Sequence, residues 1–287
     1  MKHLFLFLLI AFSVNAFGQV SCPLIYDGDG DGSVGTTDLL GLLAEFGQTC
    51  DDDSLFSCGL SVAYQGYDYA TVQIGSQCWF AENLRNENYN SGGVIANNLS
   101  AAEWSSTGIG AATIYGEGSP TCSDFAPNGD ACDEGFALHE YGRLYNWYAV
   151  DSPLGLCPSG WHVASDSEWM DLEMHLGMSS AEVNLTGYRG TNEGTSLKAA
   201  AGWFSSGGGD NSSGFSARPG GIRGGGGETQ FLNGGGGTFY WTSSKDAGQL
   251  PWYRGLTAVS SSSGQITRNK SAIENTGYSV RCLQDPE

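Results

Sequence analysis

The residues with the clearest capacity for chemistry lie in an acidic loop near the N-terminus, residues 27–38. Aspartates stand at positions 1, 3, 5 and 12 of this twelve-residue loop, with a glycine at position 6 and a serine at position 7. Carboxylates and a backbone carbonyl at these positions converge on one hard cation, and the glycine permits the sharp turn. Without a cation the four carboxylates would repel one another, which argues against a plain solvated turn. Ca²⁺ suits this many carboxylates better than Mg²⁺, and its predicted ligands are Asp27, Asp29, Asp31, Ser33 and Asp38.

A short helix must follow this loop to complete the unit. Leu39, Leu42, Leu43 and Phe46 recur at i, i+3, i+4 and i+7, which is one face of an amphipathic helix, and Gly47 can end it. The loop and helix resemble one of the two repeats of a type I dockerin, whose paired calcium motifs bind a cohesin partner. A single repeat lacks the paired helices of that binding face. The sequence therefore predicts a dockerin-like unit that binds Ca²⁺, without a cohesin-like partner.

The first residues of the chain are typical of an export signal. Lys2 precedes an unbroken apolar run over residues 4–14, and small residues then occupy the positions that a signal peptidase reads. This run is about eleven residues long, against the roughly twenty that a membrane-spanning helix needs. We assign residues 1–18 to a signal peptide and expect a secreted or cell-surface protein. A lipid-modified Cys22 is the alternative, although residues 19–21 are not the small apolar lead that precedes such a cysteine.

Composition narrows the class of protein. The 287 residues include 31 acidic and 12 basic side chains, and the net charge is −19. Nucleic-acid binding needs a basic footprint, so this charge excludes that class. The 8 Trp, 13 Tyr and 13 Phe residues supply apolar area that offsets chain entropy despite 44 glycines. We expect a folded chain with the calcium unit at residues 20–50, a linker at 51–57 and a main domain at 58–287.

Eight cysteines follow the signal, an even number that favours disulfides in an oxidising compartment. Local spacing pairs six of them, and the other two close a loop of about 125 residues, worth roughly 4 to 5 kcal/mol in the chain-entropy account. The pair that brackets the calcium unit takes the place of the missing second repeat. Metal-ligating or catalytic thiols are the alternative, but the sequence contains no Cys-x-x-Cys motif. The expected bonds are Cys22–Cys50, Cys58–Cys78, Cys122–Cys132 and Cys157–Cys282.

The main domain reads as α+β. From Cys58 onward, short apolar or aromatic runs alternate with Gly, Ser and Asn clusters, which predicts short antiparallel strands and long Gly-rich loops with two or three helices among them. Helical spacing of apolar residues predicts one helix within residues 138–150. A capping box formed by Ser165 and Glu168 predicts another, which ends at Gly177. The expected strands are residues 67–74, 78–80, 239–242, 252–256 and 278–282.

Several segments carry a family resemblance. Thr-Val-Gln-Ile-Gly at 71–75, Cys-Trp-Phe-Ala-Glu-Asn-Leu at 78–84 and Tyr-Gly-Arg-Leu-Tyr-Asn-Trp at 141–147 are three of them. Cys-Pro-Ser-Gly-Trp-His-Val at 157–163 and Gly-Tyr-Ser-Val-Arg-Cys at 277–282 complete the set. In this order they resemble the Fibrobacter succinogenes major paralogous domain over residues 58–285. The resemblance implies a secreted domain of Fibrobacter or Bacteroidota type. The order of elements is also similar to the C-type-lectin-like fold, including its formylglycine-generating, sulfatase-modifying branch.

No motif points to catalysis. Enzymes of that branch use a late cysteine pair to bind copper, whereas this chain has one late cysteine, Cys282, which we expect to pair with Cys157. Gly-x-Ser-x-Gly, His-Glu-x-x-His and phosphate-loop motifs are absent from the sequence. His139, His162 and His175 lack metal-ligand spacing, so we interpret them as structural. A two-carboxylate glycosidase stays open, because 31 acidic residues offer many pairs.

Binding is the better interpretation of the main domain. Exposed aromatic rings give sugars flat apolar faces, and Gly/Ser loops offer adaptable hydrogen bonds. The competing interpretation places the same rings in the core. We predict a secreted, non-catalytic, calcium-binding protein for extracellular recognition or surface attachment, with a glycan or a cell-surface protein as ligand. The alternatives are a secreted enzyme of the formylglycine-generating branch and an inert surface scaffold. The aromatic residues in question are Trp203, Phe204, Trp241, Trp252 and Tyr253.

Overall fold

The computed structural model describes residues 56–119, 122, 125–204, 207–226 and 231–286, together with Thr36. The chain divides into two units, Met1–Ser57 and Cys58–Glu287, and all of these residues except Thr36, Phe56 and Ser57 belong to the second unit. The predicted signal peptide and the cysteines 22 and 50 lie outside the described residues. So do the predicted calcium ligands Asp27, Asp29, Asp31, Ser33 and Asp38.

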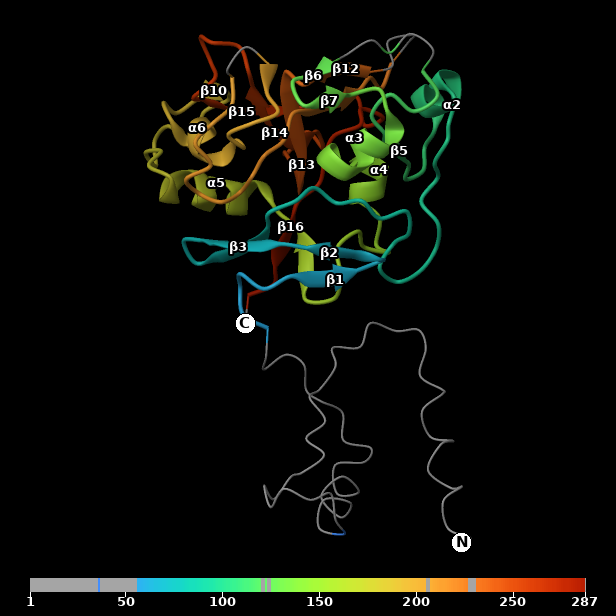
Figure 1. Cartoon of the computed structure of the whole chain (residues 1–287), viewed down its shortest axis with the longest axis horizontal. Coiled ribbons are helices and arrows are strands. Elements are labelled where there is room, and N and C mark those ends of the chain that lie inside the picture. Colours follow the sequence, from blue (N-terminus) through green and yellow to red (C-terminus); the bar gives the residue numbers. More distant parts are fainter. Residues whose placement is uncertain are drawn as a thin grey trace, which may run out of the picture. The chain divides into compact units, whose positions relative to one another are not determined.

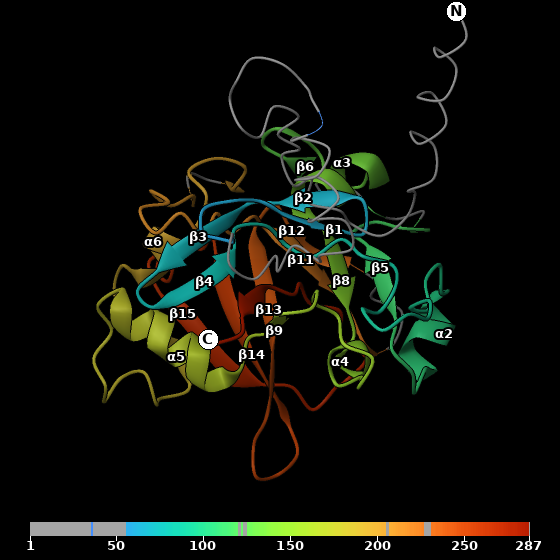
Figure 2. The ribbon, with the colours of Figure 1, turned by 90° about the horizontal axis from the view of Figure 1, so that it is seen from below.

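A six-stranded sheet forms the centre of the second unit (Figure 1). Neighbouring strands are antiparallel except β11 and β13, which pair in parallel at Gly221 and Thr238, so the prediction of purely antiparallel strands is wrong at this position. Helix α5, Asp166–His175, packs on one face of the sheet (Figure 2). In sheet order the strands are β10 (Gly187–Arg189), β15 (Ile266–Lys270), β14 (Pro251–Thr257), β13 (Gly237–Lys245), β11 (Gly220–Arg223) and β12 (Phe231–Gly234).

A second sheet of four strands joins the two ends of the domain. Its order is β3 (Thr71–Ile74), β4 (Gln77–Phe80), β16 (Cys282–Gln284) and β9 (Trp161–Val163). The first two strands in the list come from the start of the domain and β16 comes from its end, so the terminal segments hold each other in place.

Two strand predictions need correction. The continuous strand expected at 67–74 is divided at Ala70, because β2 (Tyr67–Tyr69) pairs with β1 (Val62–Tyr64) whereas β3 pairs with β4. The strand expected at 278–282 begins only at Cys282. Its earlier residues form single bridges instead, Tyr278 with Tyr145 and Ser279 with Tyr240. In both segments the chain changes partner, which a local sequence pattern does not report.

The described residues contain five helices, more than the two or three expected. The predicted helix within 138–150 is wrong as a single element: α3 ends at Tyr141, a strand follows, and α4 starts at Trp147. Gly142 has φ +72° and a Cβ there would meet the Leu84 carbonyl oxygen at 2.8 Å, so the helix cannot continue through it. The elements not yet given are α2 (Ala101–Ser106), α3 (Glu134–Tyr141), α4 (Trp147–Val150), α6 (Glu193–Leu197), β5 (Ala112–Ile114), β6 (Phe125–Ala126), β7 (Gly129–Asp130) and β8 (Arg143–Tyr145).

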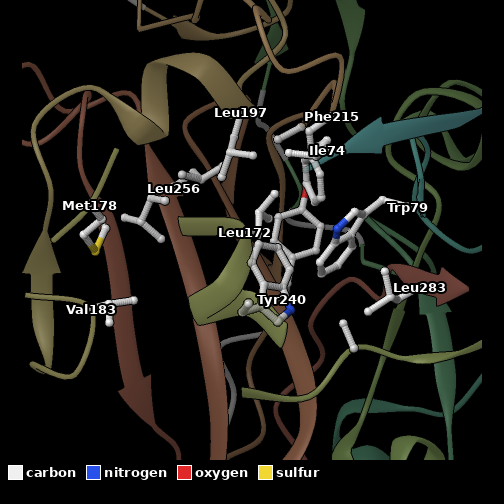
Figure 3. Packing of buried hydrophobic residues seen from close by; sticks show 14 of the residues in the cluster. Ile74, Trp79, Leu172, Met178, Val183, Leu197, Phe215, Tyr240, Leu256 and Leu283 are labelled. Carbon is white, nitrogen blue, oxygen red and sulfur yellow. The ribbon is translucent and has the colours of Figure 1, made fainter. Parts of the chain in front are cut away.

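The capping box confirms the start of α5. Ser165 Oγ accepts a hydrogen bond from the Glu168 backbone N–H, and the Glu168 carboxylate accepts one from the Ser165 N–H at 2.7 Å. The helix ends at His175, two residues before the expected Gly177. Its inward residues Trp169 and Leu172 are buried in the largest apolar cluster of the described residues, in which Figure 3 labels Leu172. Trp169 meets Trp79 edge to face at 5.1 Å between ring centroids, a favourable aromatic geometry.

Candidate ligand-binding surfaces

The described part of the chain contains no free thiol. Its six cysteines form three disulfides, Cys58–Cys78, Cys122–Cys132 and Cys157–Cys282, which are the pairs that the spacing predicts. Cys282 is thus bonded to Cys157 and is not half of an open thiol pair. Three disulfides are typical of a protein that matures in an oxidising compartment.

His162 is held between two carboxylates. Its Nε2 lies 2.9 Å from Glu168 Oε1 and its Nδ1 lies 2.6 Å from Asp285 Oδ1. The hydrogen bond with Glu168 raises the pKa of His162, with a smaller contribution from Asp285, against the opposing effect of burial. Burial by itself would raise the pKa of Glu168, but hydrogen bonds from His162 and Ser165 lower it to about 2. The arrangement ties the C-terminal end of the domain to α5, which is a structural role.

No metal centre forms among the residues the structure describes: no group of three His, Cys, Asp or Glu side chains there is arranged to hold an ion. In the same residues, no helix is both apolar enough and long enough to cross a bilayer.

A buried ion network lies beneath α5. Glu173, which is 0% exposed, accepts hydrogen bonds from Arg189 and Arg254 at 2.8 and 2.6 Å. Asp166 accepts from Arg254 and Arg268, both at 2.7 Å. These pairs connect the helix to strands β10, β14 and β15 and fix its position on the sheet. Sequence reasoning missed the network, although carboxylates three and four residues from Trp169 on the inward face of a helix were an available signal.

Three further cations are buried without a carboxylate partner among the described residues. Arg281 donates to the carbonyl oxygens of three residues and to Asn83 Oδ1, and Arg223 donates to Thr113 Oγ1 and the Leu99 carbonyl oxygen. Lys198 donates to the Gly207 and Thr257 carbonyl oxygens and lies over the Trp203 ring. Burial lowers the pKa of Lys198 to about 8 and that of Arg223 to about 10.

The five aromatic residues expected near the Gly-rich loops divide into two that are buried and three of intermediate exposure. Trp203 and Trp241 are buried, as the core interpretation predicts. Arg268 covers the Trp252 ring at 3.8 Å from its centroid, and Lys270 lies 5.2 Å from the same centroid. Phe204, Trp252 and Tyr253 have intermediate exposure, and Tyr253 lies on a surface that also includes the exposed Tyr188.

That surface is the face of the six-stranded sheet opposite α5. Tyr188, Thr267, Gly255 and Phe239 pair in sequence across β10, β15, β14 and β13, so they form one row on one face. Tyr188 is 55% exposed, and Thr267 and Phe239 are half-buried. A Cβ on Gly255 would meet Phe239 Cδ1 at 2.8 Å, which shows that the Phe239 ring lies across this glycine.

A second row extends the same face. Asn269, Tyr253 and Trp241 pair across β15, β14 and β13. Burial raises the pKa of Tyr253, and the neighbouring Tyr188 raises it further, whereas a hydrogen bond with Asn269 lowers it. The Tyr253 and Phe239 ring centroids are 6.1 Å apart. Trp241 itself is 1% exposed and packs against Trp147 and Tyr278, so the accessible part of the face presents the rings of Tyr188 and Tyr253 beside the Asn269 amide and the Thr267 hydroxyl. We call this face the aromatic face.

The domain also contains a polar pocket of about 220 Å³ at the end of β4. Glu82 and Arg85 form one wall, where they pair at 3.4 Å, and Glu140 and Arg218 form the other, where they pair at 2.8 Å. Arg281 also lines it. Among the residues singled out in the sequence, the pocket is lined by His139 and by members of two family segments, Ala81, Glu82 and Asn83 within 78–84 and Arg281 within 277–282. The pocket brings together segments far apart in the chain, so a single local motif does not predict that these residues meet.

These observations define a disulfide-linked α+β domain with buried arginines, a partly exposed aromatic face and a polar pocket. The sequence model of the Fibrobacter succinogenes major domain matches residues 72–284, so the chain belongs to that family. Neither the curated proteins nor the solved structures contain a match.

Proposed function

We propose that the protein is a secreted, non-catalytic recognition module that attaches to glycans through the aromatic face of its main domain. The observation that carries this proposal is the row formed by Tyr188, Thr267, Gly255 and Phe239, in which rings and a hydroxyl share one face that is exposed at Tyr188 and half-buried at Phe239, where the ring stacks on Tyr278. Aromatic rings offer flat apolar surfaces to the CH groups of sugars, and neighbouring hydroxyl and amide groups bind their hydroxyls.

The shape of the surface favours an extended ligand. Neighbouring strands lie about 4.8 Å apart, so a row across four strands is roughly 14 Å long. A glycan chain can lie along such a row. Protein ligands are the other candidate class, but their binding surfaces concentrate on Trp and Arg anchors in well-packed pockets, and the described part of this face contains neither an exposed Trp nor an exposed Arg.

The non-catalytic assignment is supported by the bond between Cys157 and Cys282, because the copper-binding enzymes of the formylglycine-generating branch need a free late cysteine pair. A C-type-lectin-like fold is part of the same proposal. It is supported by α5, which follows β9, and by β16, which closes the domain beside β4.

The N-terminal unit is assigned to Ca²⁺ in this proposal, and the metal stabilises that unit only. Its support is the spacing of Asp27, Asp29, Asp31 and Asp38. A calorimetric Ca²⁺ titration of the mature chain should detect one site that an Asp27→Ala/Asp31→Ala variant loses. Glycan binding by the main domain should persist in chelator, because no metal group exists among the described residues of that domain.

The test of glycan attachment is a glycan array followed by calorimetry with the strongest neutral oligosaccharide found. We expect Tyr188→Ala to weaken binding about tenfold, since one aromatic contact contributes roughly 0.5–1.5 kcal/mol. Ile109→Ala is the control, because Ile109 is 65% exposed in a loop before β5, away from the aromatic face, and should bind normally. Absence of any neutral glycan ligand, or equal affinity in Tyr188→Ala, would refute the proposal.

A further inference from the structure

The pocket at the end of β4 is a second site, distinct from the aromatic face. It lies between the residues that follow β4, the last turn of α3 and the segment around Ser216. Its volume of about 220 Å³ is below the roughly 300–1,000 Å³ of pockets that enclose a drug-sized ligand. The pocket therefore fits one small group, such as a single sugar ring.

The walls of the pocket are fixed before any ligand arrives. Arg85 donates to Glu82 and also to the backbone oxygens of Leu138 and His139 at the end of α3, at 3.3 and 3.0 Å. Its guanidinium lies over the rings of Tyr67 and Tyr69. Such packing holds a guanidinium in one orientation, which lowers the entropic cost of binding.

The floor carries a positive charge that has no ion-pair partner among the described residues and interacts with the Glu82 carboxylate only at longer range. Arg281 is 1% exposed and all its hydrogen bonds go to neutral oxygens, including Asn83 Oδ1 at 2.6 Å and the Phe215 carbonyl oxygen at 2.6 Å. No carboxylate within the described residues forms an ion pair with it. A buried charge without a counter-charge is costly, so an anion that enters the pocket is favoured.

The charges of the walls indicate how much negative charge the anion should carry. In each wall the guanidinium neutralises the carboxylate with which it pairs, so Arg281 leaves the pocket with one positive charge in excess. Among the described residues Arg218 donates side-chain hydrogen bonds only through Nη1, to Glu140, so Nε and Nη2 remain for a ligand. A single carboxylate matches the excess charge and the planar fork of donors.

We propose that this pocket binds a sugar acid, with the ligand carboxylate at Arg218 above the buried charge of Arg281. The two glutamates favour this occupant over an acidic peptide, because a sugar acid also carries hydroxyl groups that can donate to Glu82 and Glu140. An acidic peptide would instead place more negative charge beside those glutamates. The net charge of −19 on the whole chain disfavours non-specific binding of anions, so specific binding is attributable to the site.

The experiment is calorimetry on the full mature chain with a galacturonate oligosaccharide and with the neutral galactose oligosaccharide of equal length. We expect the acidic ligand to bind at least tenfold more tightly, and Arg218→Gln to remove that preference. Arg218 is partly exposed, so this variant should fold. Lys245→Gln removes a partly exposed cation that pairs with Asp151 elsewhere in the domain and should keep the preference.

Each result decides the question. Equal affinity for the two ligands, or an unchanged preference in Arg218→Gln, would overturn the proposal. So would binding of a triglutamate peptide in this pocket in place of galacturonate. The Tyr188→Ala variant separates this site from the aromatic face: it should lose affinity for neutral glycans and retain the preference for galacturonate, whereas Arg218→Gln should do the reverse.

Discussion

Two regions of this domain bury positive charge by different means. Beneath α5, Arg189, Arg254 and Arg268 share the carboxylates of Asp166 and Glu173 at 2.6–2.8 Å. In the region around Lys198, by contrast, a buried cation has, among the described residues, two carbonyl oxygens and the Trp203 ring as partners, with the ring centroid 5.0 Å from Nζ.

This difference predicts how much each charged group contributes to the free energy of unfolding. In the network every charge depends on its partners: removing one carboxylate leaves one arginine without any carboxylate in the interior and Arg254 with only one. At Lys198 the charge has no such partner and carries a desolvation cost, which is why its pKa falls to about 8. Loss of a carboxylate from the network should therefore lower the free energy of unfolding strongly, whereas loss of Lys198 should lower it only slightly.

The largest expected effect is that of Glu173→Gln. The amide leaves Arg189 without a carboxylate and Arg254 with Asp166 alone, so we expect the free energy of unfolding to fall by about 3–5 kcal/mol. Urea denaturation with the disulfides intact measures it. Asp171→Asn is the matched control, because Asp171 lies on the same helix but is exposed, and it should change stability by less than about 0.5 kcal/mol. A loss below 1 kcal/mol in Glu173→Gln would show that the network is not what holds α5 on the sheet.

Lys198→Met should cost less, about 1 kcal/mol or under at pH 7. The variant removes a charge that has no carboxylate partner, and its cost comes from the two carbonyl oxygens left without a donor. A loss as large as that of Glu173→Gln would contradict the comparison.

The pH dependence of the same variant makes the comparison sharper. The folded pKa of Lys198 is about 8, below its usual 10.5, so between these values the unfolded chain binds more protons and the wild type gains stability as pH rises. The stability difference between wild type and Lys198→Met should therefore grow by about 2–3 kcal/mol from pH 7 to pH 10.5. All other titratable groups are the same in the two proteins, so their contributions cancel in this difference. A difference that stays constant over this range would mean that Lys198 keeps its charge.

Local sequence signals account for the parts of the fold that were predicted. Ser165 and Glu168 are three residues apart and cap α5 by themselves, and the disulfide pairs follow from spacing. The continuous helix expected over 138–150 failed because Gly142 is needed at a positive φ where the chain passes close to Leu84. That requirement comes from a segment nearly sixty residues away and has no local pattern.

The buried ion network and the ligand surfaces could not be predicted from the sequence for the same reason. Asp166 meets Arg254 across 88 residues of chain, and Tyr188 reaches its row only because β10 pairs with β15. A shift of one residue in that pairing would turn Tyr188 into the core and Arg189 to solvent. Register and burial, which decide whether an aromatic residue is core or surface, therefore came only with the structure.

His162 is intermediate between the carboxylate-paired arginines beneath α5 and the unpaired Lys198. Its substitution gives the smallest expected change in stability. Its imidazole has carboxylate partners, Glu168 and Asp285, but it is about one-third exposed, so solvent screens the pair. We expect His162→Gln to cost about 1 kcal/mol or less at pH 5.5, with His139→Gln, whose imidazole is 82% exposed, as the control.

The pH window of this effect has a definite sign. The folded pKa of His162 is raised above 6.5, so its contribution is complete below 6.5 and is lost as pH rises through the folded value. Glu168 has a pKa of about 2, below its usual 4.5, so its contribution is complete above 4.5 and is lost as pH falls toward 2. The cost of His162→Gln should therefore be greatest between pH 4.5 and 6.5 and smaller at pH 9 in urea denaturation. A cost that is the same at pH 5.5 and pH 9 would place His162 with Lys198, as a residue held by packing and not by its charged partners.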